Sequence, residues 1–135
     1  MISRYYDIDD KLLASFLHHL SYVRNICAHH GRLWNRKFVI KTAKPKHPRF
    51  LSDSFNTNKH EYLFNTLVML EYMMNIINPE HHWKERLIRL LHKHKAVNLN
   101  DMGFPDNWKN TGVWNTSTFP LINKLKSKLC TILTC

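Results

Sequence analysis

Apolar residues recur at three- and four-residue steps near the start of the chain, which is the spacing of one face of an α-helix. The residues on this face are Leu12, Phe16, Leu20, Val23 and Cys27. Asp9 or Asp10 is suited to cap the N-terminus, where a carboxylate accepts hydrogen bonds from free N–H groups. The pattern ends at His29 or His30, and Gly31 predicts the stop because glycine readily takes a positive φ. We predict a helix from about residue 10 to this point, with Cys27 buried.

Two further helices follow from the same periodicity. One is predicted from Asn58, with Glu61 at capping-box spacing, to about Ile77. It is apolar almost all round, which is typical of a centrally buried helix. The next is predicted to begin at residues 78–80, where asparagine, proline and glutamate supply an N-cap, an N1 residue and an acidic first turn. One side of this helix carries Trp83, Leu87, Leu90 and Leu91.

Two segments between these helices are less regular. Residues 32–38 are charged and aromatic, and they favour a short helical turn or an irregular segment packed by Trp34 and Phe38. Residues 43–50 contain two prolines among basic side chains and predict a loop.

The C-terminal part divides at about Trp114. Residues 102–110 predict a turn into a short helix from Asp106, with Trp108 and Trp114 closing over one end of the bundle. Residues 115–135 contain no acidic residue and place lysines among apolar residues at helical spacing. We therefore predict a domain over residues 1–114 and a lysine-rich amphipathic tail over residues 115–135.

Composition favours one helical domain. A chain of 135 residues can enclose a single core, and only 3 Gly and 5 Pro argue against a turn-rich β fold. No apolar stretch reaches the roughly 18 residues that a membrane-spanning helix needs, and no export signal opens the chain. The three cysteines are widely spaced, which argues against a disulfide framework. We expect an all-α protein of the cytoplasm with no membrane partner.

Charge points to a polyanionic partner. The formal net charge is +10, and no acidic residue occurs from residue 11 to residue 52. Nine of the 20 lysines and arginines fall in that block, around the His-His pair and the aromatic residues that follow it. Such a block is typical of nucleic-acid binding, although a solvated basic surface without a ligand is the simpler alternative.

The first predicted helix also carries candidate chemistry. His18, Tyr22, Asn25 and His29 follow steps of 4, 3 and 4 and share a polar face. Imidazole titrates near neutral pH, so such a row is able to bind phosphate and to transfer protons. Arg24 lies about 140° from His29 on an ideal helix, so joining them at one phosphate requires distortion of the helix end, a long reach or a second subunit. The alternative is that Arg24 braces a neighbouring helix.

Metal chemistry has weak support in the sequence. The chain has ten histidines but neither an HExxH motif nor paired Cys and His ligands at zinc-site spacing. We therefore expect neither a metal nor another cofactor.

Two motifs give a family resemblance. Residues 24–36, RNICAHHGRLWNR, resemble the RN-x-x-AHH-x-RLWNR signature of Abi-like abortive infection proteins. Residues 102–108, MGFPDNW, resemble the MGFP-x-x-W ending of the same family. Together they bracket about residues 8–114, which correspond to the C-terminal half of family members. That family is placed in the HEPN superfamily of helical ribonucleases, so the resemblance implies an all-α, HEPN-like, dimeric helical bundle.

The resemblance also implies a mechanism and site residues. It implies metal-independent RNA cleavage by 2′-OH attack, within a toxin-like, anti-phage role. His29 would act as general acid or base, with His30 as the alternative, Arg24 would stabilise the phosphorane and Asn25 would orient the phosphate. RNA contacts are expected from Arg32, Trp34, Asn35, Arg36 and Lys37. Structural roles are the alternative for this second group, with Trp34 packing and its neighbours bracing the helix end.

The expected partners are RNA and a second copy of the chain, because HEPN sites are commonly built across a dimer. An antitoxin or an N-terminal half would be a further partner. The rival hypothesis is a non-catalytic module that binds RNA or a protein partner, as a truncated or degenerate family member would.

Overall fold

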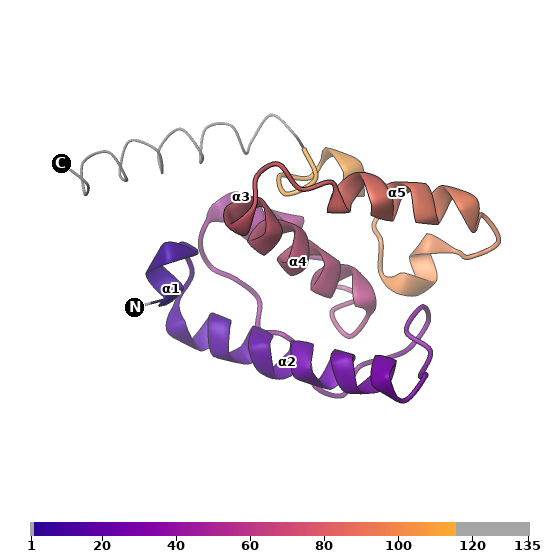
Figure 1. Ribbon diagram of the computed structural model, residues 1–135, viewed down its shortest axis with the longest axis horizontal. Coiled ribbons are helices and arrows are strands. Elements are labelled where there is room, and N and C mark those ends of the chain that lie inside the picture. The colour runs from indigo at the N-terminus through magenta and orange to yellow at the C-terminus, as the bar shows by residue number, and fades with distance from the viewer. Residues whose placement is uncertain (1, 116–135) are drawn as a thin grey trace.

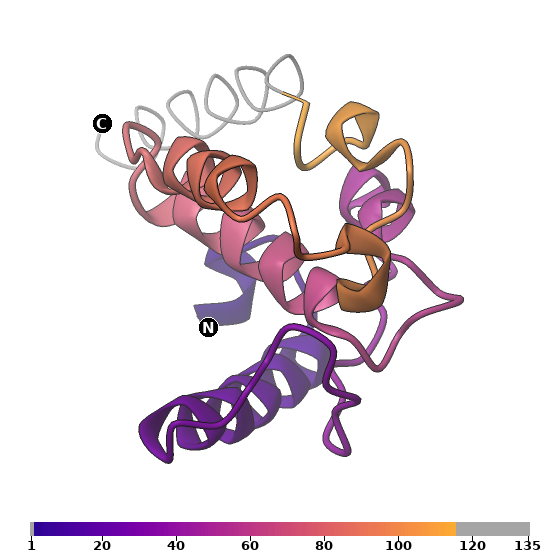
Figure 2. The same ribbon diagram turned by 90° about the vertical axis from the view of Figure 1, so that its right-hand side faces the viewer.

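The structure, a computed structural model, describes residues 2–115 and contains helices but no strand over that range. The predicted all-α class is therefore confirmed. Figures 1 and 2 show that α4 lies between the other two long helices, with α2 on one side and α5 on the other. The elements are α1 Ile2–Tyr5, α2 Asp10–Ala28, α3 Arg49–Ser54, α4 Leu63–Ile77 and α5 Trp83–Lys93, followed by 3₁₀ turns η1 Leu99–Met102 and η2 Trp108–Asn110.

Helix α2 has the predicted extent. Its N-cap is Asp9, whose Oδ1 accepts a hydrogen bond from the Leu12 N–H at 2.6 Å. The stripe that faces the core is Leu12, Phe16, His19, Val23 and Ile26. Cys27 is exposed, so the prediction that it is buried was wrong. The stripe advances by steps of 4, 3, 4 and 3, which puts position 26 rather than 27 against the core.

The end of α2 also differs from the prediction. The residue with a positive φ is His30, at 56°, and not Gly31. The Gly31 N–H donates to the Ile26 carbonyl at 2.7 Å and the His30 N–H donates to the Cys27 carbonyl at 3.1 Å. These two bonds form a Schellman motif with His30 at C′. Gly31 is needed for space, because a Cβ there would lie 2.5 Å from Ile26 Cγ2.

Helix α4 begins five residues later than predicted. Asn58 and Lys59 donate their N–H groups to Asn56 Oδ1 at 3.1 and 3.3 Å, so the polar residues stabilise a turn. The helix then starts at Leu63 without a side-chain cap and ends at Ile77, as predicted.

Helix α5 begins at Trp83, not beside Pro79. The residues predicted to start it form a turn in which the His81 N–H donates to the Asn78 carbonyl at 3.0 Å. The Trp83 N–H then donates to His81 Nδ1 at 3.0 Å, which places His81 against the helix start.

Two short elements were also misjudged. Residues 43–48 are irregular, as predicted, but α3 begins at Arg49 and was missed. It buries Leu51 completely against α4. The helix predicted from Asp106 is instead η2, one 3₁₀ turn at Trp108–Asn110.

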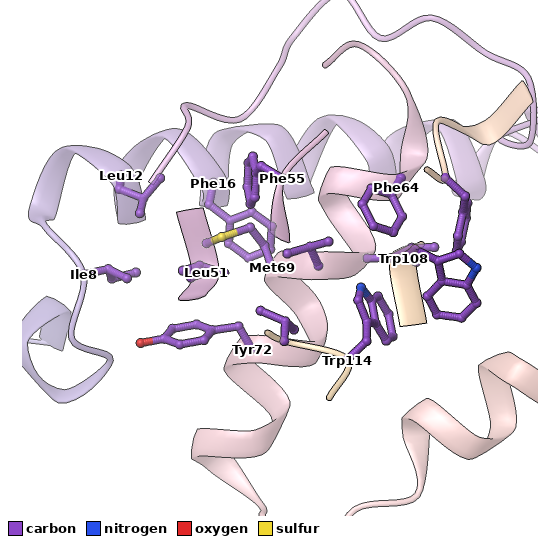
Figure 3. Close-up of a cluster of buried hydrophobic side chains, with 14 of the residues drawn as sticks. Ile8, Leu12, Phe16, Leu51, Phe55, Phe64, Met69, Tyr72, Trp108 and Trp114 are labelled. Carbon is purple, nitrogen blue, oxygen red and sulfur yellow. The ribbon is translucent and has the colours of Figure 1, made fainter. Parts of the chain in front are cut away.

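The main core surrounds α4, as its apolar sequence predicted. Phe64, Val68 and Met69 are fully buried, and aromatic rings gather at one end of the helix (Figure 3). Trp108 and Trp114 pack edge to face there with ring centroids 5.1 Å apart, which confirms that they close the core. The predicted tail lies outside the described residues from residue 116 onward, so the boundary between domain and tail stays a prediction.

Candidate functional site

The residues singled out in the sequence gather at the C-terminal end of α2 and in the segment after it. Arg24 and Asn25 lie in the last turns of the helix, and both side chains are exposed. Arg24 Nη1 donates to Asn25 Oδ1 at 3.3 Å. Between residues 2 and 115, no hydrogen bond or ion pair connects Arg24 to another helix, so it does not brace a neighbour there. The carboxamide instead holds the guanidinium at the protein surface.

The two histidines end the helix and are both exposed. His29 is the C-cap residue, and its N–H donates to the Asn25 carbonyl at 3.1 Å. His30 follows in the left-handed conformation, which turns the chain sharply. His29 therefore still makes the i→i−4 bond of the helix, although it lies one residue past the last helical residue. Whether distortion of the helix end, a long arginine reach or a second subunit joins it to Arg24 stays a prediction.

Residues 31–38 are irregular and are anchored by one aromatic residue. Phe38 is 2% exposed and packs with Val23 and Ile26 in a second, smaller hydrophobic cluster. Its N–H donates to the Glu61 carbonyl at 2.7 Å, and Lys37 Nζ lies 3.9 Å from Glu61 Oε1. Packing by Phe38 was predicted and is observed.

The anchored segment leaves its cations and Trp34 at the surface. Arg32, Trp34, Arg36 and Lys37 are all exposed. The Arg32 guanidinium carbon lies 5.5 Å from the centroid of the Trp34 ring, a cation–π distance. Trp34 itself stays 38% exposed, so the alternative that it packs into the core is not supported.

Asn35 behaves differently from its neighbours. Its side chain is half-buried, and its Oδ1 is buried without a hydrogen-bond partner among the described residues. A buried, unpaired oxygen is energetically unfavourable, and because this one is enclosed it is not presented to RNA at the surface.

The predicted polar row along α2 is only partly a surface feature. His18, Asn25 and His29 are exposed, but Tyr22 is half-buried. The Tyr22 hydroxyl accepts a hydrogen bond from the Val39 N–H at 3.4 Å, and its ring packs edge to face on Phe38. Tyr22 therefore helps to hold the segment after the helix.

A buried histidine that the sequence reading overlooked supports the same region. His19 Nδ1 donates to the Ile40 carbonyl at 2.6 Å, and its Nε2 accepts from the Thr66 hydroxyl at 2.7 Å. Burial lowers the pKa of His19, and burial with the nearby Lys41 lowers the pKa of His60. Neutral His19 thus connects α2, residue 40 and α4. The sequence signal for the burial of His19 was its position at the middle of the core-facing stripe of α2.

The described residues contain no group of three or more His, Cys, Asp or Glu side chains placed to hold a metal ion. Within residues 2–115, no helix is both long enough and apolar enough to cross a lipid bilayer.

Comparison with known proteins adds one finding. A family model of Abi-like proteins matches residues 1–35. The match contains α2 and most of the first motif, from Arg24 to Asn35, and it confirms the resemblance at the level of the family over this stretch. No curated protein and no solved structure matches the chain.

Proposed function

We propose that this protein is a metal-independent endoribonuclease of the HEPN type, which cleaves RNA as part of an abortive-infection response. The observation that carries the proposal is the exposed group at the end of α2. Arg24 and Asn25 lie in the last turns of the helix, and His29 and His30 follow directly after it. This group lies inside the stretch that matches Abi-like proteins.

The side chains suit cleavage by 2′-OH attack. In its neutral form His29 takes the proton of the 2′-OH. The imidazolium that forms then protonates the 5′-oxygen that leaves. Arg24 is permanently charged and neutralises the phosphorane, while the Asn25 carboxamide, already bonded to Arg24, fixes the guanidinium and orients the phosphate. No step requires a metal, because the guanidinium supplies the positive charge.

The surrounding surface supports RNA as the substrate. Arg32, Arg36 and Lys37 expose cations directly after the histidines, and the acid-free block continues to residue 52. Nearby cations attract a phosphate backbone regardless of base sequence. We assign these three residues to backbone contacts.

A dimer accounts for the remaining geometry. No hydrogen bond joins Arg24 to His29 or His30 within residues 2–115. Two copies related by a twofold axis would bring both α2 ends to one cleft, where the Arg24 of one subunit meets a histidine of the other. The site is then complete only in the dimer.

The test is cleavage of a labelled RNA in EDTA by purified protein. We expect Arg24→Ala and His29→Ala each to reduce the rate at least about a hundred-fold, which is the scale of one general acid or base. His30→Gly separates the two histidines, because glycine accepts the left-handed conformation at that position. Matched controls are Arg89→Ala and His94→Ala, exposed residues of α5 and its C-cap.

Co-expression of the Arg24→Ala and His29→Ala chains tests the shared site. If each site combines Arg24 of one subunit with His29 of the other, half of the dimers are mixed and each contains one intact site of two. About a quarter of the activity should return. Binding of RNA without cleavage by the unmodified protein would favour the rival non-catalytic module.

A further inference from the structure

Trp34 is the exposed aromatic residue of its segment. Between residues 31 and 39 the fold buries Phe38 and half-buries Leu33, yet Trp34 stays 38% exposed. A large aromatic surface in water is unfavourable, since burial of apolar area contributes about 25 cal/mol per Å². The same local cluster accepted the ring of Phe38, so the segment has an apolar interior that Trp34 does not enter.

The Trp34 ring is also held in place by a charge. Arg32 places its guanidinium carbon 5.5 Å from the ring centroid, and Arg32 is itself exposed. A cation over an indole restricts the ring and leaves its remaining surface accessible. Both an aromatic ring and a guanidinium plane are surfaces on which an unpaired base stacks.

The pair is close to the candidate catalytic histidines. Four peptide units connect His30 to Trp34, so their Cα atoms lie at most about 14 Å apart. The Gly31 N–H bond to the Ile26 carbonyl fixes the start of the chain between them, and the Arg36 N–H bond to the Leu33 carbonyl at 3.2 Å closes a turn around Trp34. A nucleotide next to one bound at His29 or His30 is therefore within reach of the Trp34 ring.

We infer that Arg32 and Trp34 form a base-stacking platform that makes this site specific for an unpaired nucleotide beside the cleaved bond. The inference rests on the proposed function and names its substrate class, single-stranded RNA or the loop of a folded RNA. A base inside a duplex is stacked on its neighbours and is not available to Trp34. A purine at this position is favoured over a pyrimidine, because its larger ring system stacks more area.

The first experiment measures binding separately from cleavage. In the double variant Arg24→Ala/His29→Ala, the affinity for a fluorescent 12-nucleotide RNA is measured by anisotropy, single-stranded and annealed to its complement. Adding Trp34→Ala should weaken binding of the single strand about 5- to 150-fold, the range for loss of one stacked base. Binding of the duplex should be unchanged, because only phosphate contacts remain there.

Two matched variants sharpen this result. Val39→Ala alters an 83% exposed apolar residue of the same region and should leave both affinities unchanged. Lys37→Ala should weaken the single strand and the duplex alike and reduce the salt dependence of binding. Equal binding of the single strand by Trp34→Ala and its parent, or equal loss for both RNAs, would overturn the platform.

A second measurement uses the protein without substitution at Trp34. In a series of single-stranded RNAs, one nucleotide at a time is made abasic. Removal of the base at one position should weaken binding to the same degree as Trp34→Ala does. A flat profile contradicts the inference even if the tryptophan variant fails to fold. If the protein does not cleave RNA but one abasic position weakens binding, the proposed nuclease activity is rejected and the stacking platform is retained.

Discussion

The two hydrophobic clusters of this protein differ in size and in what they support. The main cluster contains sixteen buried residues around α4, from Ile8 to Trp114, and Figure 3 shows part of it. The second contains three, Val23, Ile26 and Phe38, at the end of α2. The candidate site is attached to the second. The larger cluster should therefore dominate stability, whereas the proposed chemistry lies beside the smaller one, so substitutions should separate the two.

The largest effect is expected at Phe64, which is fully buried at the centre of the main cluster. Its ring lies 4.8 Å from the Phe104 ring and 6.3 Å from the Trp114 ring, centroid to centroid. Phe64→Ala should lower the free energy of unfolding by about 3–5 kcal/mol, measured by urea denaturation followed by circular dichroism. Leu90→Ala, at a 54% exposed position on α5, should change it by less than about 0.5 kcal/mol.

Phe38→Ala should lower the free energy of unfolding by less than Phe64→Ala does, and its effect should be local. The second cluster packs Leu33 and Phe38 against α2, and the main core around α4 does not include either residue. We expect a loss of less than about 3 kcal/mol, with hydrogen exchange accelerated at residues 31–43 and unchanged in α4. Cleavage should fall in parallel, because the cations of the segment lose their fixed position. Uniform acceleration of exchange across the protein would show that the two clusters form one cooperative unit.

His19 joins the two regions and should give the smallest effect, one that depends on pH. The folded protein holds this histidine neutral, with its pKa below 6.5, whereas the unfolded chain binds a proton at about pH 6.5. Because the unfolded state binds more protons, stability is full above that pH and declines as pH falls below it, until the lowered folded-state pKa is reached.

His19→Leu should remove this part of the pH dependence and cost about 1–3 kcal/mol at pH 8, since the Ile40 carbonyl and the Thr66 hydroxyl lose their partner. The measurement is the midpoint of thermal unfolding between pH 5 and pH 8. His94→Leu, at an exposed position, is the control. Its unfolding midpoint should change with pH as steeply as that of the parent protein. An unchanged slope in His19→Leu would place the acid sensitivity elsewhere, with His60 the next residue to substitute.

The sequence determined the helices whose signals are local. Periodicity located α2, and Asp9 caps it because a carboxylate there needs only the nearby N–H groups. The apolar content of α4 predicted its central position, and the motif at residues 24–36 identified the exposed polar group at the end of α2. Each of these depends on residues within a few positions of one another.

Tertiary packing decided the rest. Asn58 and Asn78 have good capping side chains, but the chain uses them in turns, since α4 and α5 must begin where Leu63 and Trp83 meet the core. Pairing of His19 with Thr66, 47 positions away, could not be inferred from local spacing. Which of two aromatic residues in one segment stays at the surface was likewise set by the fold, because Phe38 packs against Val23 and Ile26 of α2 while Trp34 stays 38% exposed.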